Sequence, residues 1–124
     1  MPVSAGYIDF VRDLLAHFEP LRIRRMFGGA GVYSGELFFA ILADDTLYLK
    51  VDDNTRADCE ARRLLPFRYR SKQGKTLTMG YYPLPAEALE DPEKLRVWAT
   101  RAVEAAARAA SGGSTRRDPG SPKG

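Results

Sequence analysis

The sequence predicts an α+β fold in which one antiparallel sheet is flanked by helices, and three observations support this prediction. Apolar residues recur at three- and four-residue steps near both ends of the chain, which is the period of an amphipathic helix. Between Leu21 and Val51 the period changes to two, which is typical of strands. The length of 124 residues suits one domain with a hydrophobic core of its own.

The first expected element is a helix that begins after Ser4, a residue type that caps helix N-termini. Its apolar face is formed by Tyr7, Ile8, Val11, Leu14, Leu15 and Phe18. Pro20 closes this segment because proline does not continue a helix. The sequence therefore predicts one amphipathic N-terminal helix.

Four strands are expected next, as an antiparallel meander. They are Leu21 to Phe27, Gly31 to Ser34, Glu36 to Ala43 and Thr46 to Val51. The third is apolar on both faces, with Leu37, Phe39 and Ile41 on one side and Phe38, Ala40 and Leu42 on the other. A strand of this kind is expected at the centre of a sheet and covered on both faces.

A middle helix, a second hairpin and a last helix complete the expected domain. The middle helix covers Thr55 to Leu64, and the hairpin strands are Phe67 to Arg70 and Thr76 to Tyr82. The sheet then has about five to six strands in two hairpin or meander units. The last helix begins near Pro92. We expect the domain to span residues 1–110 and residues 111–124, which contain no core-forming residue, to be a disordered tail.

Charge and composition narrow the classes of function. The formal net charge is +3, but up to Ala110 there are 16 Lys and Arg against 15 Asp and Glu, so most of the excess lies in the tail. A near-neutral domain gives little support for a polyanion partner. The chain has no apolar run long enough for a membrane span and no recognisable signal peptide, so we expect a cytoplasmic protein with no membrane partner.

Residues that resemble catalytic or metal-binding groups have simpler interpretations. Cys59 is the single cysteine, which excludes an intramolecular disulfide, and His17 is the single histidine, so no zinc site of usual spacing forms. We expect Cys59 to be a small buried side chain. The acids Asp44, Asp45, Asp52 and Asp53 flank one strand at opposite ends, so we interpret them as turn and helix-cap residues.

Two glycine-containing motifs mimic phosphate loops. Gly28, Gly29 and Gly31 precede a strand, whereas a dinucleotide fingerprint precedes a helix, so we interpret these glycines as a sharp hairpin or bulge. The tripeptide Gly74-Lys75-Thr76 resembles the end of a Walker A motif, but Tyr69 stands where its first glycine is needed. We therefore expect no nucleotide site and no cofactor.

The candidate contact residues are six cations in a segment without an acid. They are Arg62, Arg63, Arg68, Arg70, Lys72 and Lys75. The aromatic residues Phe67 and Tyr69 lie among them. Proteins bind single-stranded nucleic acid by stacking bases on aromatic side chains and by neutralising the phosphate backbone with cations. A smaller cluster, Arg22, Arg24 and Arg25, breaks the strand alternation at Arg24-Arg25 and predicts a bulge or a strong twist there.

The segment from Arg24 to Asp53, RRMFGGAGVYSGELFFAILADDTLYLKVDD, resembles the signature of TfoX/Sxy N-terminal domains. The resemblance continues through LPFRY, MGYYPLP and LEDPEKLRVWATRAVEAA, in the same order and with similar spacing, and covers Tyr7 to Ala107. The signature residues, for which the resemblance implies a structural role, are Arg25, Met26, Phe27, Gly28, Gly29, Gly31 and Tyr33.

The resemblance implies an α+β fold, self-association as a homodimer, and a role in regulating bacterial competence genes through other transcription factors. It implies no enzymatic activity, cofactor, metal or small-molecule substrate. We expect a stand-alone form without the second, helical domain of the competence regulators. The preferred hypothesis is a regulatory module whose sheet edge or basic hairpin binds another protein or a second copy of itself. The alternative is direct binding of single-stranded nucleic acid through the basic hairpin.

Overall fold

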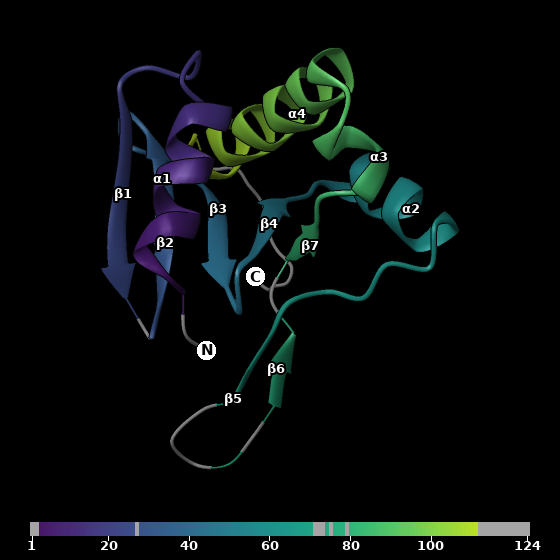
Figure 1. Ribbon diagram of the computed structural model, residues 1–124. Helices are drawn as coiled ribbons and strands as arrows, with labels where there is room; N and C mark the ends of the chain where they lie inside the picture. Colours follow the sequence, from purple (N-terminus) through teal and green to yellow (C-terminus); the bar gives the residue numbers. More distant parts are fainter. Residues whose placement is uncertain (1–2, 27, 71–73, 75, 79, 112–124) are drawn as a thin grey trace.

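A computed structural model of the chain describes residues 3–26, 28–70, 74, 76–78 and 80–111 (Figure 1). The predicted disordered tail lies outside the described residues, apart from Ser111. Among the described helices, none is both long and apolar enough to cross a bilayer.

Five antiparallel strands form the main sheet, in the order β1, β2, β3, β4, β7. Their bounds are Leu21–Met26 for β1, Gly29–Ser34 for β2, Leu37–Ala43 for β3, Thr46–Lys50 for β4 and Tyr81–Pro83 for β7. Two further strands, β5 (Arg68–Arg70) and β6 (Thr76–Thr78), pair only with each other and extend away from the main sheet in Figure 1. The predicted α+β fold and the central position of the third strand are confirmed.

The predicted strand Thr76 to Tyr82 is wrong as a single element, because it is divided between two sheets. β6 pairs with β5, whereas β7 pairs with β4 and places Tyr82 opposite Leu49. Gly80 lies between the two strands, and a glycine weakens a strand interior. The division adds a fifth strand to the main sheet and leaves β5 and β6 as a separate hairpin.

Four helices accompany the sheet, and α1 and α4 cover one of its faces (Figure 1). Their bounds are Ala5–Leu14 for α1, Asp53–Ala61 for α2, Ala86–Leu89 for α3 and Pro92–Ala110 for α4. The side chain of Ser4 caps α1 by accepting a hydrogen bond from the Tyr7 N–H, and Asp91 caps α4 in the same way. The short helix α3 is an element that the sequence did not predict.

A bulge in β3 corrects the predicted division of its side chains between the two faces. The register with β2 shifts between Val32 and Tyr33, so β3 carries one extra residue at Phe39. Phe39 and Ala40 consequently both lie in the core on the helix side, whereas Phe38 and Ile41 lie on the opposite face. Simple alternation assigned Phe39 and Ile41 to one face, which is wrong because the bulge resets the period.

Of the two alternatives predicted at Arg24-Arg25, a bulge or a strong twist, the bulge is wrong. β1 pairs with β2 without interruption from Leu21 to Met26. Arg25 lies on the helix side of this regular strand, where its guanidinium donates a hydrogen bond to the Val3 carbonyl at 3.2 Å. Two adjacent arginines therefore fit a regular strand because it lies at an edge of the sheet.

The main core lies between the sheet and the helices. Its fully buried side chains include Val11 and Leu15 of the N-terminal segment and Val32, Phe39 and Leu42 of the sheet. The buried face of α4 consists of Leu95, Trp98 and the alanines Ala99, Ala102, Ala105 and Ala106. Small side chains let this helix approach β3 and β4 closely, and α4 contacts both strands.

Candidate binding surfaces

The structure describes three of the six side chains of the predicted basic patch, those of Arg62, Arg63 and Arg68. Arg62 and Arg63 follow α2, whereas Arg68 and the backbone of Arg70 belong to β5. Lys72 and Lys75 lie outside the described residues, as does the side chain of Arg70. The described part of the run is therefore split between two elements.

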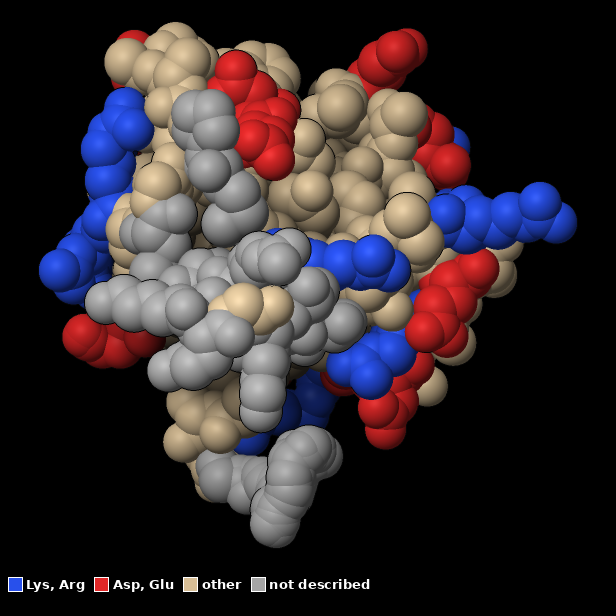
Figure 2. All heavy atoms as spheres, turned by 90° about the horizontal axis from the view of Figure 1, so that it is seen from below, with Lys and Arg blue, Asp and Glu red and all other residues tan. Residues whose placement is uncertain are grey.

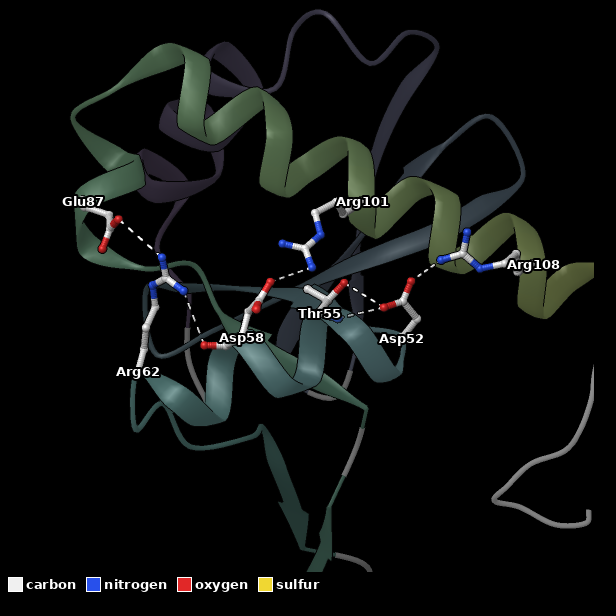
Figure 3. A network of polar contacts seen from close by, with 7 residues as sticks. All are labelled: Asp52, Thr55, Asp58, Arg62, Glu87, Arg101 and Arg108. Carbon is white, nitrogen blue, oxygen red and sulfur yellow. Dashed lines mark hydrogen bonds and ion pairs between the residues drawn. The ribbon is translucent and has the colours of Figure 1, made fainter.

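Arg62 is occupied by contacts to neighbouring elements (Figure 3). Its guanidinium lies 3.7 Å from the Glu87 carboxylate, donates to the Asp58 carbonyl and lies 5.3 Å from the centre of the Trp98 ring. The Arg101 guanidinium lies 5.1 Å from the centre of the same ring, so both cations are close enough for cation–π attraction. Arg62 therefore links the end of α2 to α3 and α4, although its side chain remains 40% exposed.

Two further ion pairs join α2 to α4 and were missed from the sequence (Figure 3). Arg101 donates to Asp58 at 2.8 Å, and Arg108 contacts Asp52. The two arginines are seven residues apart, a spacing that places them on one face of the helix. This spacing could have indicated from the sequence that both arginines contact the same neighbouring element. These pairs explain the position of α2 along α4.

The side chain of Asp52 caps α2 and also holds a buried polar group. Its Oδ1 accepts hydrogen bonds from the Thr55 N–H at 2.8 Å and from the Thr55 hydroxyl at 2.9 Å. Thr55 is buried, so this acceptor satisfies a hydroxyl that water does not reach. Burial acts to raise the pKa of Asp52, but the Thr55 hydrogen bonds and the charge of Arg108 outweigh it and lower that pKa.

The other predicted structural residues take the expected roles. Asp44 and Asp45 both have positive φ, of 52° and 51°, in the turn between β3 and β4. Cys59 is buried, and burial raises the pKa of its thiol to about 11 despite the nearby Arg101 and Arg62. Among the described residues, no three His, Cys, Asp or Glu side chains lie close enough together to hold a metal ion.

The glycine hairpin of the signature is a structural element, as predicted. Gly28 has a φ of +78° in the two-residue connection between Met26 and Gly29, and such a backbone favours glycine. A Cβ at Gly31 would stand 2.8 Å from Phe38 Cε1 and 2.9 Å from Met26 Cε. The absence of a side chain at Gly31 therefore leaves room for the side chains of Phe38 and Met26 to lie over β2. Phe27 lies outside the described residues.

The sheet face opposite the helices carries a second, aromatic cluster. Phe67 and Tyr81 are buried in it, and Phe38, Ile41 and Tyr48 are half-buried. Tyr33 stacks on Phe38 with ring centroids 5.0 Å apart. Two cations lie over this face, with Arg22 5.1 Å from the Tyr33 ring and Lys50 5.1 Å from the Tyr81 ring. Burial, with a contribution from Arg56, lowers the pKa of Lys50.

The two edges of the main sheet differ in what covers them. At the β7 edge, the Phe67 N–H donates to the Tyr81 carbonyl at 2.8 Å, and Pro83 offers no N–H. On the side of β1 that faces away from β2, no backbone hydrogen-bond partner is present among the described residues. The Gly35 N–H donates a hydrogen bond to the Pro20 carbonyl at 2.7 Å, so Pro20 and Gly35 form a hydrogen-bonded pair. Because such pairs occur at every second residue of an antiparallel ladder, Arg22 and Arg24 are also hydrogen-bonded to β2.

The alternation of hydrogen bonds then leaves Leu21, Ile23 and Arg25 with backbone groups directed outward. Their neighbours Arg22 and Arg24 are exposed on the aromatic face. Figure 2, seen from below, shows Lys and Arg side chains gathered along the left margin, the side on which β1 lies in Figure 1. We refer to this strand with its outward backbone groups and its arginines as the open edge.

Comparison with known proteins agrees with the signature and the fold. Residues 13–106 match the model of the TfoX N-terminal domain family, which is more than half of the chain. A search of curated proteins found no match. The match includes the glycine hairpin, the central bulged strand, the ion pair between Asp58 and Arg101, and the open edge. The chain therefore belongs to the TfoX N-terminal domain family.

Proposed function

We propose that this chain is a non-enzymatic regulatory module that acts by binding another protein. The observation that carries the proposal is the contrast between the two sheet edges, one occupied by Phe67 and Pro83 and the other open. Proteins usually blunt or cover an edge strand, because an edge is a template for pairing with another chain. A regular six-residue strand whose outer side has no backbone partner among the described residues supports a binding role.

The proposed class of partner rests on the resemblance of the sequence to TfoX/Sxy N-terminal domains. We propose a transcription factor as the partner and the control of competence genes as the process. Self-association as a homodimer is a second mode of binding that we propose, through a surface other than the open edge.

Single-stranded nucleic acid is the alternative partner, and the described geometry gives it less support than a protein. Phe67 is buried against Tyr48, with ring centroids 5.1 Å apart, so it is not presented to a base. Arg62 is engaged with Glu87 and Trp98. Arg68 is exposed on β5, and it is the hairpin cation whose side chain the structure describes.

Affinity capture of the full chain from native lysate, followed by mass spectrometry, tests the proposal, with light scattering on the purified protein to measure self-association. The expected result is a defined protein partner that survives nuclease treatment. A strictly monomeric protein that retains no partner would contradict the proposal. Loss of all binding on nuclease treatment, with a steep salt dependence that disappears in Arg68→Ala, would favour nucleic acid instead.

A further inference from the structure

The open edge identifies the chemistry of a partner, an inference that rests on the proposed protein-binding function. We propose that β1 binds an extended acidic segment of another protein as an added antiparallel strand. In that segment acidic residues alternate with β-branched apolar residues. The backbone of β1, its helix-side residues and its arginines each fix one property of the segment.

The backbone groups of β1 set the register of the added strand. Leu21, Ile23 and Arg25 direct their N–H and carbonyl groups outward, as shown by the register with β2 and the hydrogen bond between Gly35 and Pro20. An added strand pairs with these three residues. Main-chain hydrogen bonds supply affinity in this mode of recognition, and side chains supply specificity.

The helix side of β1 favours apolar residues in the partner. Leu21 and Ile23 are half-buried and pack against the main core, so each leaves part of its apolar surface at the edge. Partner residues directly opposite them point to the same face of the sheet. Val or Ile at those positions would extend the core and bury apolar area.

The aromatic face of β1 favours acidic residues in the partner. Arg22 and Arg24 are exposed there, and no described carboxylate lies within ion-pair distance of either. Partner residues opposite them occupy non-hydrogen-bonded positions, where side chains approach most closely. Asp or Glu at those positions would pair with the guanidinium groups.

A second copy of this chain does not fit the open edge. In an antiparallel self-pairing that uses the outward groups, Arg22 or Arg24 of one copy stands opposite Arg22 or Arg24 of the other in each central register. Like charges directly opposite each other destabilise a strand pair. The same arginines that repel a second copy attract an acidic strand, so the edge selects its partner by charge.

The first test is a titration of the full chain, isotopically labelled for NMR, with the blocked peptide EVEVEVE at low salt. The expected result is that the amide signals of Leu21, Ile23 and Arg25 shift most and that their hydrogen exchange slows. The control peptide has the same sequence with N-methylated valines, which removes the donors facing β1 and keeps the charge. No shifts on β1, or equal binding of the two peptides, would overturn the proposal.

A charge swap tests the role of the arginines. Arg22→Glu combined with Arg24→Glu is expected to weaken EVEVEVE binding by roughly tenfold or more and to create binding of the peptide KVKVKVK. The matched control is Arg56→Glu with Arg96→Glu, which changes the net charge equally on α2 and α4 and is expected to retain EVEVEVE binding. Equal weakening in both double variants would show a net-charge effect and overturn the proposal.

Capture from lysate separates this inference from the proposed function. If the wild type and the Arg22→Glu, Arg24→Glu variant retain the same partner equally, the protein-binding function stands and the inference about β1 fails. If the wild type retains no protein partner, the proposed function fails. Retention by the wild type and the Arg56→Glu, Arg96→Glu control, with loss in the β1 variant, supports both.

Discussion

At the scale of single residues, two glycines have opposite roles that a matched pair of substitutions separates. Gly31→Ala places a Cβ 2.8 Å from Phe38 and 2.9 Å from Met26, so we expect a loss of about 1–3 kcal/mol in the free energy of unfolding. Gly6 lies in α1 with open space around it, and Gly6→Ala is expected to stabilise by about 0.5 kcal/mol. Urea denaturation of both variants measures this, and a stable Gly31→Ala protein would contradict the close approach.

Asp52 predicts a pH dependence with a defined sign. Because its pKa is lower in the folded protein than in the unfolded chain, its charge stabilises the fold at neutral pH, and this contribution is lost as the pH falls below about 4. Asp52→Asn keeps a capping oxygen and loses the charge, whereas Asp52→Ala also loses the cap, which costs about 1 kcal/mol more. Denaturation curves from pH 7 to pH 3 should show the wild type and Asp52→Asn converging at low pH. A constant gap would contradict the account.

At the scale of elements, the bulge in β3 decides which side chains of this strand lie in the main core. Phe39 is fully buried on the helix side, so Phe39→Ala is expected to cost about 3–5 kcal/mol. Ile41 is half-buried on the aromatic face, and Ile41→Ala is expected to cost less than half as much. Chemical denaturation compares the two variants. Equal losses would mean that the bulge does not separate these side chains.

The contact between α2 and α4 depends on Trp98 more than on the ion pairs around it. Trp98 is 7% exposed, so Trp98→Ala is expected to cost about 3–5 kcal/mol. Arg101 and Asp58 are 28% and 49% exposed, and a double-mutant cycle should give a coupling below about 1 kcal/mol. A coupling as large as the Trp98 loss would reverse this ranking.

At the scale of the whole molecule, the elements that follow from local chemistry were predictable from the sequence. Ser4 and Asp91 cap helices, and Asp44 and Asp45 form the turn, because a few neighbouring residues determine these structures. The fold class followed from the change of period at Leu21 and from the apolar third strand.

The features that could not be predicted from the sequence depend on residues that are distant from one another along the chain. The bulge at Phe39 and the separation of β7 from β6 are set by strand pairing across the sheet. The contacts of Arg62 with Glu87 and Trp98 could not be read from its sequence neighbours, because those two residues lie on other elements. The arginines of β1 were visible as a cluster, but only the sheet order shows that they line an open edge.

On the side facing away from β2, β1 has no backbone partner among the described residues, and amide hydrogen exchange in the isolated full chain measures whether this edge is open. We expect the amides of Leu21, Ile23 and Arg25 to exchange rapidly, because their N–H groups face outward, and those of Arg22 and Arg24 to be protected by β2. Alternating protection along β1 is the predicted result. Uniformly slow exchange from Leu21 to Arg25 would show that the edge is already covered and would contradict the claim.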